Sequence, residues 1–193
     1  MIIVGVGVGP NMLTQEAMDA ISNASIIYGS KRSIELAKDF INCEPQLIKD
    51  YKKLHLLPED AVLLSTGDPM FSGLGKFAKE GDRIIPGISS LQVACSRLGV
   101  SLANLAAITA HGRDPAPAKE ALIQELNLGK NIFMLPAPNF GPAEVAEILK
   151  ELGIDAMIYV CENIGYPDER IAGGSVDEPP VAESDLFAVM IVR

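Results

Sequence analysis

The sequence predicts an α/β fold built from two small α/β domains. In the first half of the chain, short apolar runs alternate with segments of helical periodicity, which is typical of a parallel sheet covered by helices. Most of these runs end at a glycine or a proline, as strands that lead into turns often do. Near the C-terminus, the runs 169–176 and 186–192 have no helical pattern between them, so we expect antiparallel strands and a mixed sheet there.

Four strand-and-helix pairs are expected in the first domain. The predicted strands are apolar runs at 2–8, 25–29, 61–65 and 83–85. The predicted helices follow them at 13–24, 32–40, 71–81 and 89–99. Thr14 is a suitable cap for the first helix, and a serine begins the last one.

The Pro- and Asp-rich stretch 114–117 is the expected boundary, which gives domains of residues 1–113 and 114–193. In the second domain a helix is expected from Ala118, and the acidic segment 176–184 is interpreted as a solvated loop. The other elements predicted before the antiparallel pair are a strand at 131–135, a helix at 142–153 and a strand at 156–163.

Charge and composition exclude several classes of function. The 193 residues carry a formal net charge of −9, which argues against nucleic acid as the main partner because phosphate binding requires a basic face. Because the net charge is negative and gives no long-range attraction to an anion, a polyanionic small ligand would need local basic groups. No apolar run is long enough to span a membrane, and no basic segment precedes the first run, so we expect a cytoplasmic protein without a signal peptide.

The three cysteines, Cys43, Cys95 and Cys161, are far apart and show no metal-ligand spacing. The two histidines are not arranged as zinc ligands either. We therefore expect buried thiols and no metal site.

Four loops would meet at the carboxyl edge of the first sheet, where ligands bind in open α/β folds: 5–10, 65–73, 86–90 and 109–113. The first loop, GVGVGP, has a glycine spacing that differs from the dinucleotide fingerprint, and its third glycine comes one residue early. No acidic residue follows the second strand, where Tyr28-Gly29-Ser30-Lys31-Arg32 stands. This absence counts against both a dinucleotide site and a Rossmann-fold methyltransferase. A glycine-rich strand end without a nucleotide role remains an alternative.

The loops STGDPMFSG and PGISS carry more information together than apart. Gly67-Asp68-Pro69 predicts a rigid turn at a strand end. Taken alone, Asp68 and Ser89 are equally well explained as caps of the helices that follow. The order of the three loops along the chain is what points to a particular protein class.

That order resembles the tetrapyrrole methylase family, whose motifs G-x-G near residue 5, S-x-G-D-P near residue 65 and P-G-x-S-S near residue 86 are all present. The resemblance extends over essentially the whole chain. It implies a methyltransferase that uses S-adenosylmethionine, has two α/β domains with the cofactor in the cleft between them, and forms a homodimer. One departure is Val8, which stands where the family commonly has a proline.

Two further segments are similar to one branch of the family. Ala110-His111-Gly112-Arg113 and the run Cys161–Ile171, CENIGYPDERI, resemble members that methylate carbon C5 of a cobalt-precorrin, cobalt-precorrin-7, in anaerobic cobalamin biosynthesis. Three alternatives stay open: methylation at another ring position, a protein or ribosomal RNA substrate, and a non-catalytic ligand-binding module.

The resemblance also implies roles for individual residues. Those expected to contact the cofactor are Val8, Gly67, Asp68, Phe71, Ser89, Ser90, Met134, Asn163 and Ile164. Those expected to bind the carboxylate arms of the substrate are His111, Arg113, Lys31 and Arg32.

Some of these roles have a competing interpretation. Lys31 and Arg32 are also explained as an ordinary solvated helix start. His111 is a candidate general base, although a hydrogen bond to a substrate carboxylate fits it better. Glu162 and Glu169 either order the structure or contact the substrate. In-line methyl transfer to an electron-rich ring carbon requires mainly alignment and exclusion of water, so no catalytic residue is assigned.

Overall fold

The computed structural model describes residues 1–112 and 114–193 and divides the chain into two compact units, Met1–Ser89 and Ser90–Arg193. This division lies earlier than the boundary after residue 113 that the sequence predicts. The reason is β6 (Leu105–Thr109), which pairs along its whole length with β7 (Asn131–Leu135) and so belongs to the second sheet.

The first unit contains the predicted parallel sheet, with the strand order β3-β2-β4-β1-β5. Its strands are β1 (Ile2–Gly5), β2 (Ile27–Gly29), β3 (Gln46–Leu47), β4 (Val62–Ser65) and β5 (Arg83–Ile85). All neighbouring pairs are parallel, so the carboxyl ends of the strands lie at one edge. The edge strand β3 is not among the predicted strands, because two residues carry no readable period.

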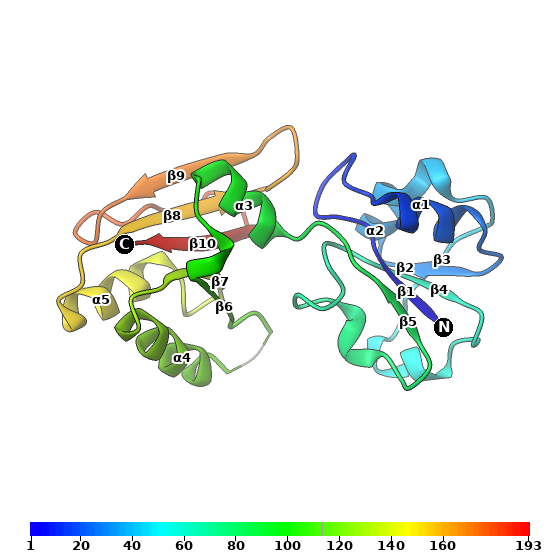
Figure 1. Cartoon of the computed structure of the whole chain (residues 1–193), viewed down its shortest axis with the longest axis horizontal. Coiled ribbons are helices and arrows are strands. Elements are labelled where there is room, and N and C mark those ends of the chain that lie inside the picture. The colour runs from blue at the N-terminus through cyan, green and yellow to red at the C-terminus, as the bar shows by residue number, and fades with distance from the viewer. Residues whose placement is uncertain (113) are drawn as a thin grey trace. The chain divides into compact units, whose positions relative to one another are not determined.

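Helices cover one face of this sheet, and short 3₁₀ segments cover the other (Figure 1). The helices are α1 (Gln15–Ser22) and α2 (Lys31–Ala37), with the 3₁₀ turn η1 (Lys38–Phe40) after them. Thr14 Oγ1 accepts a hydrogen bond from the Ala17 amide at 3.2 Å, as the predicted cap requires. The opposite face is covered by η2 (Tyr51–Leu56) and η3 (Leu74–Phe77).

The helix predicted at 71–81 is wrong. Only the four residues of η3 are helical there. Ser72 has φ of 57°, which interrupts a right-handed helix, and the glycines at 73 and 75 further lower the helix propensity.

The second unit contains the predicted mixed sheet, with the order β6-β7-β10-β8-β9. Strand β10 (Phe187–Val192) runs antiparallel to both β7 and β8 (Met157–Glu162), and β9 (Arg170–Gly174) runs antiparallel to β8. The carboxyl ends of β6, β7 and β8 therefore share an edge with the beginnings of β9 and β10.

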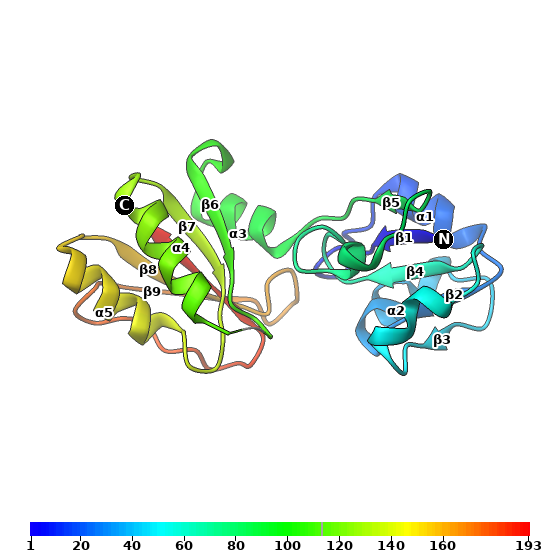
Figure 2. The same ribbon diagram turned by 90° about the horizontal axis from the view of Figure 1, so that it is seen from below.

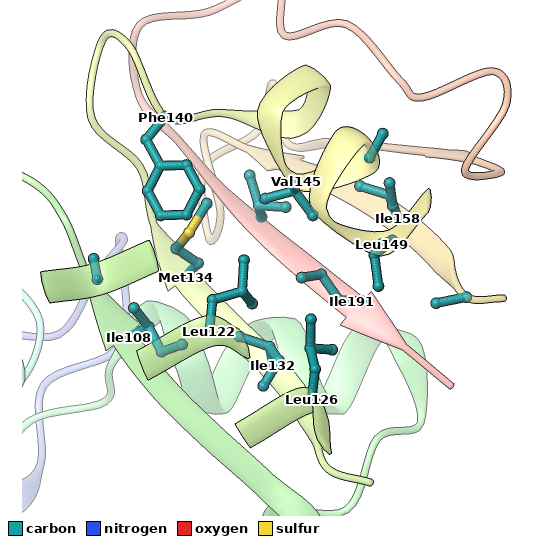
Figure 3. Packing of buried hydrophobic residues seen from close by; sticks show 14 of the residues in the cluster. Ile108, Leu122, Leu126, Ile132, Met134, Phe140, Val145, Leu149, Ile158 and Ile191 are labelled. Carbon is teal, nitrogen blue, oxygen red and sulfur yellow. The ribbon is translucent and has the colours of Figure 1, made fainter. Parts of the chain in front are cut away.

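Helices lie on both faces of the second sheet. Two views show α4 (Ala116–Asn127) and α5 (Pro142–Leu152) on one face and α3 (Ser90–Leu98) on the other (Figures 1 and 2). The turn η4 (Leu102–Asn104) connects α3 to β6. The core under α4 and α5 is a fully apolar cluster, labelled in Figure 3 with Leu122, Leu126, Ile132, Met134, Val145, Leu149, Ile158 and Ile191.

The ends of α5 follow from its sequence. Pro142 occupies the first turn, and the Gly141 amide donates to Glu144 Oε2 at 2.8 Å. Gly153 ends the helix with φ of 64°, a left-handed conformation that glycine adopts without a Cβ penalty. No helix among residues 1–112 and 114–193 is long and apolar enough to cross a membrane.

Candidate functional site

Three of the predicted loops meet through their main chains at the carboxyl edge of the first sheet. A Cβ atom on Gly5 would lie 2.6 Å from the Gly87 nitrogen and 2.8 Å from the Gly67 carbonyl oxygen. A Cβ on Gly87 would collide with the same Gly67 oxygen and lie 2.9 Å from Gly5 Cα. The glycines of the three motifs therefore form one glycine junction, Gly5, Gly67 and Gly87, in which only glycine at positions 5 and 87 allows the loops to approach the Gly67 carbonyl.

The first and second loops are also joined by a hydrogen bond. The Gly67 amide donates to the Gly7 carbonyl at 2.8 Å, and the two residues have φ of 69° and 78°. In the direction in which Gly67 lacks a side chain, the nearest atom is Ser89 Cα at 4.0 Å. A side chain at Gly67 would thus meet no close neighbour, although the residue itself is buried and its amide is already bonded to Gly7. At Gly5 and Gly87, in contrast, the main chain is packed.

Asp68 joins the second loop to the third. Its Oδ1 accepts from the Met70 amide at 2.8 Å, and its Oδ2 accepts from the Gly87 amide at 3.1 Å. The first of these bonds closes a turn, in which the Phe71 amide also donates to the Asp68 carbonyl at 3.1 Å. A carboxylate has about four acceptor positions, so Asp68 can hold both loops and still accept from a ligand.

The other predicted cofactor residues near this edge differ in exposure. Ser89 is buried, Ser90 is half-buried at the beginning of α3, and Phe71 is half-buried in the second loop. Val8 is buried, so little of this residue is exposed to a ligand.

The structure separates Lys31 from Arg32. Lys31 is exposed, as the solvated helix start predicts. Arg32 is half-buried, and its Nη2 donates to the Val8 carbonyl at 2.8 Å. Arg32 therefore supports the first glycine loop, a role that the sequence does not reveal because the contact joins residues far apart in the chain.

The second unit brings other predicted residues to the carboxyl edge of its own sheet. Asn163 and Ile164 follow β8, and His111 lies exposed after β6. Arg113 lies outside the described residues. Met134 is in β7, and its side chain is fully buried beside the Phe140 ring (Figure 3). The residue as a whole is 0% exposed and is paired with strands on both sides, so the second unit by itself exposes no part of Met134 to a ligand.

Asn163 has an unusual backbone that its neighbours maintain. Its φ is 46°, in the left-handed region that asparagine tolerates better than most residues. Its amide donates to the Leu186 carbonyl at 3.0 Å, and its side-chain Nδ2 donates to Asp168 Oδ2 at 2.9 Å. Ser184 Oγ donates to Asn163 Oδ1 at 3.2 Å. We name residues 163–165 the adenine loop, after the role that the resemblance gives to Asn163 and Ile164.

Glu162 is a buried carboxylate just before this loop. Its Oε2 accepts from Arg170, and its Oε1 accepts from the amides of Glu183 and Ser184, the latter at 2.8 Å. Burial raises the pKa of Glu162, but the hydrogen bonds from Arg170, Ser184 and Glu183 together bring the pKa below its ordinary value. Glu162 therefore stays ionised, and the segment 176–184 is tied to it rather than being only a solvated loop.

Glu169 anchors the other end of the same region. Its Oε1 accepts from Arg97 Nε at 2.7 Å, and its Oε2 accepts from the Gly165 amide at 2.8 Å. Burial raises its pKa, and the bonds from Arg97 and Gly165 outweigh this and lower it overall. Glu162 and Glu169 thus both bind groups of the second unit, which favours the structural interpretation of their role.

Cys161 and Cys95 are buried as expected, and Cys43 is half-buried. Burial, with smaller contributions from the Glu169 charge and Cys95, raises the pKa of Cys161 to about 12. Among the described residues, no group of three His, Cys, Asp or Glu side chains is placed to hold a metal ion.

A hollow at the opposite, amino edge of the first sheet is a weaker candidate. It lies under α1 and is crossed by an ion pair of 2.6 Å between Arg83 Nη2 and Glu16 Oε1. Its other charged lining residues, Asp19 and Asp60, are acidic. It contains no residue of the three motif loops, so we place the candidate site at the carboxyl edges.

The comparisons with known proteins agree with the motifs. Residues 1–180 match the family described as Tetrapyrrole (Corrin/Porphyrin) Methylases. The probable cobalt-precorrin-7 C(5)-methyltransferase of Methanocaldococcus jannaschii is 36% identical over 205 residues, which cover 95% of this chain and 92% of that protein. The cobalt-precorrin-7 C(5)-methyltransferase of Salmonella typhimurium is 29% identical over 181 residues, covering 88% and 87% of the two chains.

A solved structure has the same fold over the whole chain. The cobalamin biosynthesis precorrin-6Y methylase (cbiE) of Archaeoglobus fulgidus superposes with a TM-score of 0.78 at 30% identity, covering 100% of this chain and 97% of that one.

Proposed function

Because this chain belongs to the tetrapyrrole (corrin/porphyrin) methylase family, we propose that it is an S-adenosylmethionine-dependent enzyme that methylates C5 of a cobalt-precorrin, cobalt-precorrin-7, in anaerobic cobalamin biosynthesis. The observation that carries the proposal is the match over nearly the full length of both chains to a relative named for this reaction. The AHGR and CENIGYPDERI segments support the same branch of the family. Ala110, His111 and Gly112 follow β6, and the second segment begins in β8 and ends in β9.

The loops of the first unit suit this cofactor. The half-buried Asp68 carboxylate and the Ser89 hydroxyl offer acceptors and a donor to a ribose and a zwitterionic tail. S-adenosylmethionine supplies an electrophilic methyl group on its sulfonium. In the second unit, we assign Asn163 and Ile164 to the adenine of the cofactor.

The protein's part in the reaction is to align the reactants and exclude water. A corrinoid carbon is itself the nucleophile, so the chain need not supply one. Cys161 is unsuited to that role, because its thiol is buried and its pKa is about 12. The positioning of the reactants can account for roughly 7–11 kcal/mol of the barrier.

The carboxylate arms of the substrate require basic groups, which are scarce on a chain of net charge −9. We propose His111 and Arg113 for this role, with Lys31 as a further contact. Arg32 is a weaker substrate candidate than Lys31, because its guanidinium already donates to the first glycine loop. We also propose that the enzyme is a homodimer, which a measurement of its molar mass by light scattering on the purified protein tests. We propose the cytoplasm as the compartment in which it acts.

The test combines binding with turnover. Calorimetry with S-adenosylmethionine and S-adenosylhomocysteine should give saturable binding to both. Incubation with cobalt-precorrin-7 and methyl-labelled S-adenosylmethionine should then transfer the label to the corrinoid. His111→Ala and Arg113→Ala should impair this transfer and leave cofactor binding unchanged.

Each competing function predicts a different result. A non-catalytic module would bind the cofactor and transfer no label to any tetrapyrrole. A family enzyme for another ring position would methylate a different precorrin in preference. Failure to bind either cofactor form would rule out the proposed enzyme.

A further inference from the structure

Segment 181–186, which we name the strap, crosses the carboxyl edge of the second sheet just before β10. It connects to the adenine loop at several points. The Asn163 amide donates to the Leu186 carbonyl at 3.0 Å, and Ser184 Oγ donates to Asn163 Oδ1 at 3.2 Å. The Leu186 amide donates back to Ser184 Oγ at 3.2 Å, which closes the strap on itself beside Asn163. The strap and the adenine loop therefore share one hydrogen-bonded network.

The buried side chain of Glu162 and its partner Arg170 both bind this strap. Glu162 Oε1 accepts from two consecutive strap amides, those of Glu183 and Ser184, while Oε2 accepts from Arg170. Arg170 also binds the strap directly, because its Nη2 pairs with Glu183 Oε1 at 2.9 Å. The side chain of Glu162 is 2% exposed, so the charge has no access to bulk water and depends on these partners.

The register of the sheet explains why Glu162 can bind both Arg170 and the strap. It is the last residue of β8 and lies opposite Arg170 at the beginning of β9 and Phe187 at the beginning of β10. The next residue, Asn163, takes the left-handed conformation. Asparagine tolerates this conformation, and the hydrogen bonds to Leu186 and Ser184 stabilise it further. Glu162 precedes Asn163 in the chain, the strap bonds to Asn163 through Ser184 and Leu186, and Asp168 accepts from its side chain on the other side.

We propose that Glu162 is a positioning residue, which with Arg170 clamps the strap against Asn163 and so sets the shape of the adenine loop that the proposed function assigns to the cofactor. The inference rests on that proposed function for its ligand. Glu162 acts through Asn163 and does not itself contact the cofactor.

Two variants test the clamp. Glu162→Gln keeps the size of the side chain, but it removes the charge and turns one acceptor into a donor that faces an amide or Arg170. The expected result is S-adenosylhomocysteine binding weakened about tenfold or more, since losing charged hydrogen bonds in a buried site is worth at least one such factor. The KM for S-adenosylmethionine should rise by a similar factor, while kcat at saturating cofactor should stay within about threefold of the wild-type value.

Ser184→Ala, which leaves Glu162 intact, should weaken S-adenosylhomocysteine binding by a smaller factor than Glu162→Gln does.

Glu125→Gln is the matched control. It removes another partly buried ion pair of the same unit, between Glu125 Oε2 and Lys130 Nζ at 2.6 Å, which lies before the amino end of β7. This variant should lose stability without any change in cofactor affinity. If Glu162→Gln behaves like it, with lower stability and unchanged affinity and KM, the proposal is overturned. If Glu162→Gln does not fold, Arg170→Gln and Ser184→Ala decide, and wild-type affinity in both overturns it.

Amide hydrogen exchange gives a readout that needs no cofactor. In Glu162→Gln, the amides of Asn163 and Tyr166 should exchange faster, because they are bonded to Leu186 and Asn163 carbonyls in the clamped state. Unchanged exchange at these amides would contradict the clamp. A wild-type protein that binds no cofactor while its variants show faster exchange would refute the proposed function and leave the clamp intact. The two failures are therefore distinguishable.

Discussion

The Asp68 carboxylate accepts a hydrogen bond of 3.1 Å from the main-chain amide of Gly87, although the two residues belong to loops after different strands. The same carboxylate accepts from Met70 within its own loop. Together with the contacts among Gly5, Gly67 and Gly87, this bond makes one rigid edge from three motif loops. It also gives Asp68 a role in shaping the site in addition to its expected contact with a cofactor.

Replacing Asp68 should weaken cofactor binding. Asp68→Asn keeps the shape but places an NH₂ group against one of the two amides, so one loop loses its bond. We expect the affinity for S-adenosylhomocysteine, measured by calorimetry, to fall about tenfold. Asp60→Asn, at an exposed acid on the amino side of the same sheet, is the control and should bind as the wild type does. Equal affinities for all three proteins would contradict the role given to Asp68.

Gly87→Ala should destabilise the protein strongly. The new Cβ would collide with the Gly67 carbonyl and crowd Gly5, and neither main-chain group can rotate away. Steric conflicts of this kind cost on the order of 2–4 kcal/mol or prevent folding. Gly141→Ala is the matched control, because its backbone is extended and its nearest neighbour atom would be 3.7 Å away. Thermal unfolding should show a large loss only for Gly87→Ala, and equal losses would argue against the glycine junction.

Acid should destabilise the second unit through Glu162 and Glu169. Both have a folded pKa below the ordinary value of 4.5, so their contribution to stability is complete above that value and is lost as the pH falls through the folded pKa. Glu162→Gln should therefore lower stability near neutral pH and flatten its decline in acid. Urea unfolding at a series of pH values measures this. A variant whose stability declines with pH as steeply as that of the wild type would contradict the assignment.

The three cysteines should differ in reactivity. Burial raises the pKa of both Cys95 and Cys161, the latter to about 12, so neither forms much thiolate near neutral pH. Cys43 is half-buried and should react first with an alkylating reagent. Mass spectrometry of the labelled peptides should find the label at Cys43 in the native protein and at all three residues after unfolding. Native labelling of Cys161 as fast as Cys43 would contradict its burial.

The sequence was sufficient for the features that depend on local period and on motif order. Alternating apolar runs and helices predicted the parallel first sheet, and the uninterrupted pair of C-terminal runs predicted the mixed second sheet, because strand and helix periods are local properties. The motif loops were found at the expected strand ends. These features led to the right family.

Features that depend on contacts between residues far apart in the chain could not be predicted from local periodicity and motif order. The pairing of β6 with β7 moves the division of the chain to Ser89–Ser90, and nothing near residue 105 signals it. The bond from Arg32 to Val8 and the clamp of Glu162 on the strap likewise join segments separated by many residues. The helix expected at 71–81 was a local error, since its glycines and the positive φ of Ser72 oppose a helix.

The central claim is that this chain methylates C5 of a cobalt-precorrin, and the most direct measurement is the position of the transferred methyl group. Purified protein is incubated with cobalt-precorrin-7 and S-adenosylmethionine that carries an isotope-labelled methyl group, and the product is examined by NMR. The account predicts a single labelled methyl group, bonded to C5. A label on another ring carbon, or no transfer by a protein that binds the cofactor, would contradict it.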